Sequence, residues 1–129
     1  MTTAVEIDLT DDAVLSTLRD VVAERPEYVY SSPEYMGSTD ESGSCFYVHK
    51  DEDGANVGAG CAVGVVLHRL GMSLGDLEQH EGEAAWTLLN KIGPKLSERT
   101  KNRLNDMQAY QDEGKAWGLA YAQATGETI

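Results

Sequence analysis

Cys61 and His49 are the residues whose types and positions come nearest to a catalytic pair. Cys61 follows the glycine-rich segment NVGAG and opens the apolar stretch AVGVVLHRL, which has the composition of a buried helix. Unpaired N–H groups and the helix dipole favour a thiolate at a helix start. His49 ends a strand-like run, CFYVH, and would serve as base if that strand packed on the helix. One interpretation is therefore a small cysteine-dependent hydrolase or transferase.

The same residues also describe an ordinary packed helix. A cysteine without a catalytic partner commonly behaves as a small apolar core residue. The neighbours of Cys61 are glycine and alanine, which supply neither an orienting acid nor an oxyanion-stabilising side chain. We therefore favour the packed helix and a protein that is not an enzyme, with Cys61 and His49 as the catalytic alternative.

Metal and cofactor sites are not indicated by the spacing of their usual ligands. Cys45 and His49 would lie about 13 Å apart along a strand, and Cys61 and His68 about 10 Å apart along a helix. A calcium loop beginning at His49 would have glycine, Gly60, where the last ligand belongs. The run NVGAGCAVG lacks the lysine of a phosphate-binding loop. We expect no metal and no cofactor, although a mixed site joining Cys61 to Cys45 or His49 stays open.

The elements that would position these residues are mainly helices. Apolar periodicity and breakers predict helices over 11–25, 60–70, 82–92 and 97–114, with shorter ones over 74–80 and before Gly126. Short strands are expected over 28–30 and 45–49, with a turn over 50–56. The segment 31–44, rich in serine and acid, is expected to be a mobile loop. The fold class is therefore mainly α (α+β): a single domain over 1–129, with a compact cluster of about five helices and one small antiparallel β-ribbon.

Local signals support these helix boundaries. Thr10, Ser73 and Ser97 each stand where a hydroxyl can cap a helix start. Gly60 and Gly64 lie one helical turn apart and would let a neighbouring backbone approach the central helix closely.

The chain is strongly acidic, with 10 basic and 22 acidic residues and a net charge of −12. Residues 1–54 hold 3 basic and 13 acidic side chains, so most of the excess lies in the first part. This charge disfavours nucleic-acid and membrane partners. It either keeps the protein soluble or forms an acidic face that docks on a basic partner or imitates DNA.

The segments that decide cellular location point to the cytoplasm. No window approaches the length of a membrane span, and MTTAVEIDLTDD has neither a basic leader nor an apolar signal core. We expect a cytoplasmic protein in which Cys45 and Cys61 stay reduced, with a disulfide between them as the less favoured alternative.

One segment runs against the overall charge. Lys95, Arg99 and Arg103 recur every four residues and are expected to form one stripe on a helix. This stripe is a candidate for weak nucleic-acid contact. It lacks stacking aromatic residues, so a solvated helix face is the favoured interpretation.

Three segments carry a resemblance to known sequences: CFYVHK, GCAVGVVLHRLGMSL and QAYQDEGKAWGLAYAQA, together with the YVY run at 28–30. With these, the chain resembles a group of small uncharacterised accessory proteins of actinobacteriophages and their hosts, over roughly residues 26–122. The resemblance implies action in a bacterial host cell but carries no functional residue across. We expect a non-catalytic accessory protein that binds a host or phage macromolecule, most simply a protein, with self-association left open.

Overall fold

The structure is a computed structural model that describes residues 9–30, 46–81 and 83–128. Within these residues it contains six helices and one two-stranded antiparallel sheet. The predicted mainly helical fold with one small ribbon is confirmed. The loop expected over 31–44 and Cys45 lie outside the described residues. In chain order the elements are α1 (Asp11–Glu24), β1 (Val48–Lys50), β2 (Asn56–Ala59), α2 (Ala62–Arg69), α3 (Leu74–Glu78), α4 (Ala85–Ile92), α5 (Glu98–Asp112) and α6 (Trp117–Thr125).

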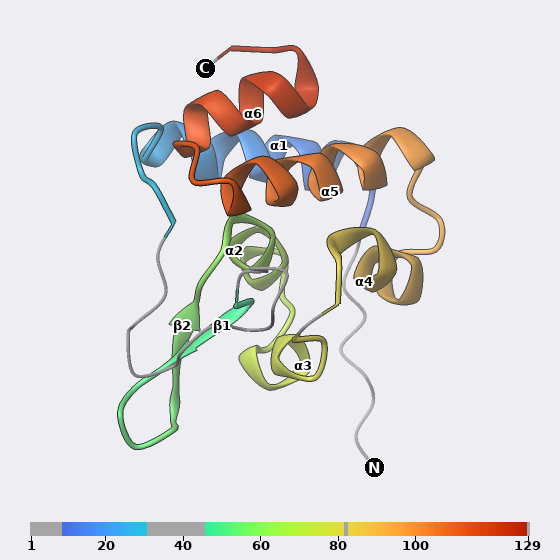
Figure 1. Cartoon of the computed structure of the whole chain (residues 1–129). Coiled ribbons are helices and arrows are strands. Elements are labelled where there is room, and N and C mark those ends of the chain that lie inside the picture. The colour runs from blue at the N-terminus through green and yellow to red at the C-terminus, as the bar shows by residue number, and fades with distance from the viewer. Residues whose placement is uncertain (1–8, 31–45, 82, 129) are drawn as a thin grey trace.

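Helix α2 occupies the centre of the molecule. Figure 1 shows α1, α5 and α6 together on one side of it, and the ribbon with α3 on the other. Helix α2 contacts α1, α3, α5 and strand β2, which is why its apolar residues are buried around most of the circumference. The core therefore runs from the α1–α5–α6 layer through α2 to the ribbon.

Three helices are capped by the side-chain hydroxyl of their own N-cap residue. The side chains of Thr10, Ser73 and Ser97 accept the backbone N–H three residues ahead, at 3.1, 3.1 and 3.2 Å. Each bond satisfies one of the N–H groups that a helix start leaves unpaired. All three caps match the sequence prediction.

Helices α2 and α4 receive their caps from α5 instead. The side-chain oxygen of Gln111 accepts the backbone N–H of Ala62 at 2.9 Å, and that of Gln108 accepts the N–H of Ala85 at 2.8 Å. Both glutamines are buried, so water has no access to these two N–H groups and the glutamine oxygens satisfy them instead. Helix α5 thereby fixes the positions of two other helices.

The ribbon pairs β1 with β2 and turns at an acidic tip. His49 lies opposite Gly58, and Lys50 lies opposite Asn56, so Val57 is an extra residue in β2. The Asp51 carboxylate accepts the N–H groups of residues 53 and 55 at 2.9 and 3.0 Å, which closes the turn. Gly54 has a φ of +87°, a conformation that favours glycine. The turn expected over 50–56 is confirmed for residues 51–55, whereas Lys50 and Asn56 pair as strand residues.

Close contact between the ribbon and α2 depends on two glycines. A Cβ atom on Gly64 would lie 2.5 Å from the carbonyl oxygen of Tyr47. One on Gly60 would lie 2.5 Å from the carbonyl oxygen of Phe46 and 2.6 Å from the His49 ring. The predicted close approach at these glycines is confirmed, but Gly60 precedes α2 instead of lying on it one turn from Gly64.

Three strand assignments differ from the sequence prediction. Strand β1 is Val48–Lys50, where a strand over 45–49 was expected. The segment 28–30 forms no strand, because its neighbour is a helix start: the carbonyl oxygen of Tyr28 accepts the N–H of Trp117 at 2.9 Å. The second strand of the ribbon is Asn56–Ala59, which was expected to be a glycine-rich approach to the helix. A tyrosine-rich run forms a strand only where a neighbouring strand is available to pair with it. Here β2 pairs with β1 and not with residues 28–30.

Candidate functional site

The first candidate site is the start of α2, where Cys61 is the N-cap residue. The N–H groups of Gly60 and Cys61 donate to the carbonyl oxygens of Tyr47 and Phe46 at 2.9 and 3.0 Å. The ribbon is thus hydrogen-bonded directly to the helix start, as the catalytic alternative requires. Cys61, however, has none of its surface exposed. A nucleophile must meet its substrate, so this burial weighs against a catalytic thiol.

His49 lies beside that helix start and is held by a tyrosine. Its Nε2 is 2.8 Å from the hydroxyl oxygen of Tyr30, which also accepts the N–H of Phe46 at 3.0 Å. This hydrogen bond occupies Nε2, and the ring tautomer decides which of the two groups donates. Burial lowers the pKa of His49 and favours the neutral ring. The structure brings His49 next to Gly60, one residue before Cys61, with Nε2 already engaged by Tyr30.

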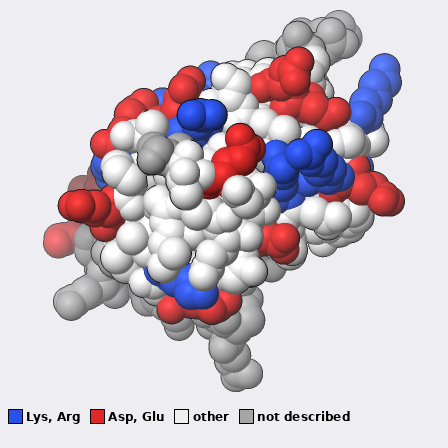
Figure 2. Space-filling model, turned by 90° about the horizontal axis from the view of Figure 1, so that it is seen from above, with Lys and Arg blue, Asp and Glu red and all other residues white. Residues whose placement is uncertain are grey.

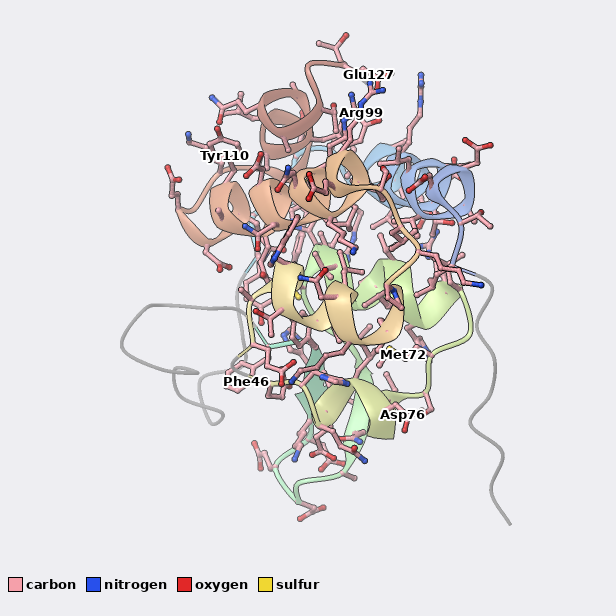
Figure 3. The ribbon with its side chains drawn as sticks, turned by 90° about the vertical axis from the view of Figure 1, so that its right-hand side faces the viewer. Phe46, Met72, Asp76, Arg99, Tyr110 and Glu127 are labelled. Carbon is pink, nitrogen blue, oxygen red and sulfur yellow. The ribbon has the colours of Figure 1, made fainter. Side chains whose placement is uncertain are left out.

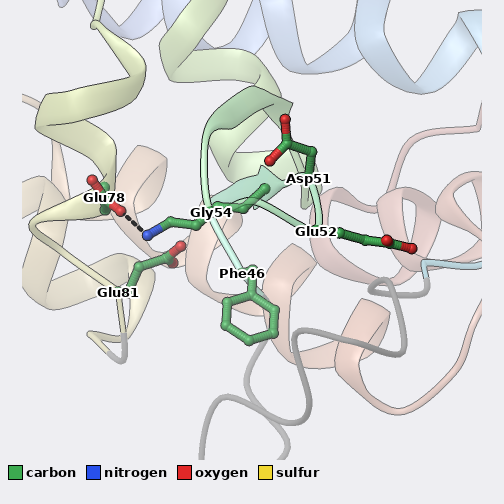
Figure 4. A pocket seen from close by; sticks show the side chains of 7 residues that line it. Phe46, Asp51, Glu52, Gly54, Glu78 and Glu81 are labelled. Carbon is green, nitrogen blue, oxygen red and sulfur yellow. Dashed lines mark ion pairs between the residues drawn. The ribbon is translucent and has the colours of Figure 1, made fainter.

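The second candidate site is an open pocket between the ribbon turn and the end of α3 (Figure 4). Its volume is about 350 Å³. Four of its lining residues are acidic, one is basic and one is aromatic, so its formal charge is negative. The lining residues are Phe46, Lys50, Asp51, Glu52, Gly54, Glu78 and Glu81.

The carboxylates of this acidic pocket differ in their surroundings. Glu78 forms an ion pair with Lys50, which lowers the pKa of Glu78. Glu81 accepts the N–H groups of Tyr47 and Val48 at 2.6 and 3.2 Å, so it also covers the outer edge of β1. Desolvation by burial nevertheless raises the pKa of Glu81. The pocket therefore contains a carboxylate whose charge is incompletely compensated.

The predicted basic stripe is not formed. Helix α5 begins at Glu98, so Lys95 precedes the helix and cannot share a helical face with Arg99 and Arg103. The Ser97 cap is the physical reason, since it starts the helix after Lys95. Arg103 is turned toward the end of α6, where it lies 3.5 Å from Glu127 and 3.3 Å from the carbonyl oxygen of residue 125. Figure 3 shows Arg99 and Glu127 in the upper part of the view and Phe46 in the lower half.

A different surface lies over α6, whose nine residues include no charged side chain. Leu119 on this helix is 51% exposed, and Val29 beside the first turn of α6 is 49% exposed. Figure 2 shows a broad uncharged area on the face viewed from above, with charged side chains around it. Such a surface suits contact with another macromolecule but does not specify which.

The acidic pocket was missed at the level of sequence. Glu78 and Glu81 are separated from the turn residues 50–54 by α2, so no motif spacing links them. Phe46 stood in the predicted strand without an assigned role. The only local signal was the acidic run DED at 51–53, which favoured a charged hairpin turn. The pocket arises from the folding of α3 back onto the ribbon.

Metal sites and membrane-spanning helices are both absent from the described part of the chain. Among residues 9–30, 46–81 and 83–128, no three His, Cys, Asp or Glu side chains are arranged to hold a metal ion. None of the helices in these ranges is both long and apolar enough to cross a bilayer.

Comparison with known proteins finds no matching family model, no matching curated protein and no matching solved structure. The function must therefore be argued from the chain's own residues.

Proposed function

We propose that this chain is a small acidic accessory protein of the phage type that binds a protein in a bacterial cytoplasm, without catalysis. The acidic pocket carries the proposal, because it joins four carboxylates and an aromatic ring on a chain with a net charge of −12. Charge of one sign around a hollow favours partners of opposite charge and speeds their association. The expected partner is a host or phage protein with a basic surface.

The binding function is tested by capture from an actinobacterial lysate, using the wild-type chain and two charge-matched double variants. The pocket variant is Glu52→Gln with Glu78→Gln, and the control is Asp12→Asn with Asp20→Asn on α1. We expect a partner that the wild type and the control retain and the pocket variant loses. Capture that is equal for all three chains at physiological salt, or no capture at all, would contradict the proposal.

A cysteine-dependent activity is the alternative, favoured by the position of the His49 ring beside Gly60. Site-resolved alkylation by iodoacetamide distinguishes the two. A packed Cys61 reacts at least tenfold more slowly in the folded chain than in urea, whereas a catalytic thiolate reacts faster than an ordinary thiol below about pH 7. Labelling of folded Cys61 faster than an ordinary thiol below about pH 7 would contradict the non-catalytic proposal.

A further inference from the structure

The acidic pocket already holds one cationic group, and that group belongs to the chain itself. Lys50 extends from the end of β1 to the carboxylate of Glu78 at the end of α3 (Figure 4). The side chains of Lys50 and Glu78 keep 34% and 36% of their surface exposed. An ion pair this accessible to water contributes little to stability and exchanges readily. The Lys50 ammonium therefore shows that the pocket binds a cationic group, and the pocket stays open to solvent while Lys50 is bound.

The rest of the pocket is not neutralised by Lys50. Glu81 lies beside this ion pair, partly desolvated and hydrogen-bonded only to backbone N–H groups in the described residues. Glu52 is exposed on the ribbon turn at the rim. With Lys50 counted, the lining has one positive and four negative side chains. A second cation would be attracted to this site by charge alone.

We propose that the acidic pocket receives an arginine side chain from a basic segment of the partner protein, and that Lys50 occupies part of the site until the partner binds. This inference rests on the proposed function and names the chemistry of the partner. The arginine displaces Lys50 from Glu78, and its guanidinium group lies among Glu78, Glu81 and Phe46.

Arginine fits this lining better than lysine does. Its planar guanidinium group offers five N–H donors that can reach two carboxylates at once, and it stacks on aromatic rings. Glu78 and Glu81 supply the carboxylates, and the half-buried ring of Phe46 supplies an aromatic wall. A lysine ammonium is a compact point charge without this planar donor geometry, so it matches two carboxylates and an aromatic ring less well.

Competition between Lys50 and the incoming arginine gives two opposite effects. Lys50→Gln removes the competitor and should tighten binding by about threefold to tenfold, the range of an exposed ion pair. Glu78→Gln removes an acceptor and should weaken binding by about the same factor, and Glu52→Gln removes a negative charge at the rim and should weaken it by less. Phe46→Leu should weaken the binding of arginine more than that of lysine, because only the guanidinium group stacks.

The test is a titration of the full chain with fluorescein-labelled Gly/Ser peptides containing arginine, lysine or citrulline, read by fluorescence anisotropy. Charge-matched controls are Lys95→Gln, outside the pocket, for Lys50→Gln, and Asp12→Asn, on α1, for the glutamate variants. We expect arginine to bind tightest and citrulline not at all, with the Lys50 and Glu52 variants shifting affinity in opposite directions. Thermal melts confirm folding, and Glu52→Gln, on the exposed turn, serves as the second variant should Glu78→Gln unfold.

The inference is overturned if Lys50→Gln changes the affinity no more than Lys95→Gln, or Glu52→Gln and Glu78→Gln no more than Asp12→Asn. Equal binding of the lysine and arginine peptides overturns the assignment to arginine. The peptide titration needs no natural partner, so its failure is distinct from the failure of the proposed function. If the chain binds arginine peptides in the expected pattern but captures no protein from lysate, this inference stands and the broader proposal is contradicted.

Discussion

The side-chain oxygen of Gln111 lies 3.0 Å from the indole nitrogen of Trp117 and accepts its N–H. The same oxygen accepts the backbone N–H of Ala62 at the start of α2. One buried atom of α5 thus joins the start of the central helix to the largest side chain of α6. The catalytic alternative would have needed this helix start to be open, whereas α5 covers it.

Replacing Gln111 should destabilise the fold strongly. Gln111→Leu preserves much of the volume but leaves two buried N–H groups, those of Ala62 and Trp117, without an acceptor. We expect the free energy of unfolding to fall by about 2 to 4 kcal/mol, measured by urea denaturation. Gln123→Leu, exposed on α6, is the control and should change it by less than about 0.5 kcal/mol. A small loss for Gln111→Leu would show that this bond does not hold the helices together.

Adding a methyl group to Gly64 should separate the ribbon from α2. The new Cβ would meet the backbone carbonyl of Tyr47, which cannot move without shifting β1. We expect Gly64→Ala to lower the free energy of unfolding by about 1 to 3 kcal/mol. Gly75→Ala in α3 is the matched control, since its Cβ meets nothing within 4 Å and alanine favours helix. The two substitutions should therefore have opposite signs in thermal denaturation.

Glu81 should give the protein a component of stability that is lost as the pH rises. Burial raises its pKa above the ordinary 4.5, so the folded state holds the proton more tightly than the unfolded state. This contribution is complete below pH 4.5 and disappears as the pH rises through the folded pKa. The melting temperature of the wild type minus that of Glu81→Gln should fall as the pH rises from 4.5 through the folded pKa of Glu81.

Glu83 supplies the opposite control for this pH dependence. Hydrogen bonds from Lys91 and His80 lower the pKa of Glu83, so its contribution is present above 4.5 and is lost as the pH falls through the folded value. The melting temperature of the wild type minus that of Glu83→Gln should therefore rise with pH. Curves of the same slope for both pairs would contradict the assignment of burial as the dominant cause at Glu81.

Removing the Tyr30 hydroxyl should destabilise the segment that holds His49. In Tyr30→Phe, Nε2 loses its hydrogen-bond partner, and the N–H of Phe46 loses its acceptor. We expect the free energy of unfolding to fall by about 1 kcal/mol, measured by urea denaturation. Tyr110→Phe on α5 is the control and should change it by less than about 0.5 kcal/mol. Equal stability of the two variants would mean that the Tyr30 hydroxyl does not hold this segment.

The starts of α1, α3 and α5 follow from short-range chemistry, which is why sequence reasoning located them well. The helices expected from 60 and 82 begin instead at Ala62 and Ala85, where α5 supplies the caps. The hydroxyl of Ser97 captures an N–H only three residues ahead, so the start of α5 needs no information from elsewhere. The expected basic stripe failed for the same reason, because the Ser97 cap excludes Lys95 from the helix. Strand β2 was missed because a glycine-rich segment indicates a strand only once β1 lies beside it.

The sequence by itself determined the helical class, the helix starts at Thr10, Ser73 and Ser97, and the acidic turn of the ribbon, since each depends on residues a few positions apart. Only the tertiary structure decided the caps on α2 and α4, whose bonded residues lie 49 and 23 positions apart. It also decided the acidic pocket, because Glu78 and Glu81 reach the ribbon only after α3 has packed against it. Contacts between distant segments depend on how the whole core packs, and no local pattern encodes them.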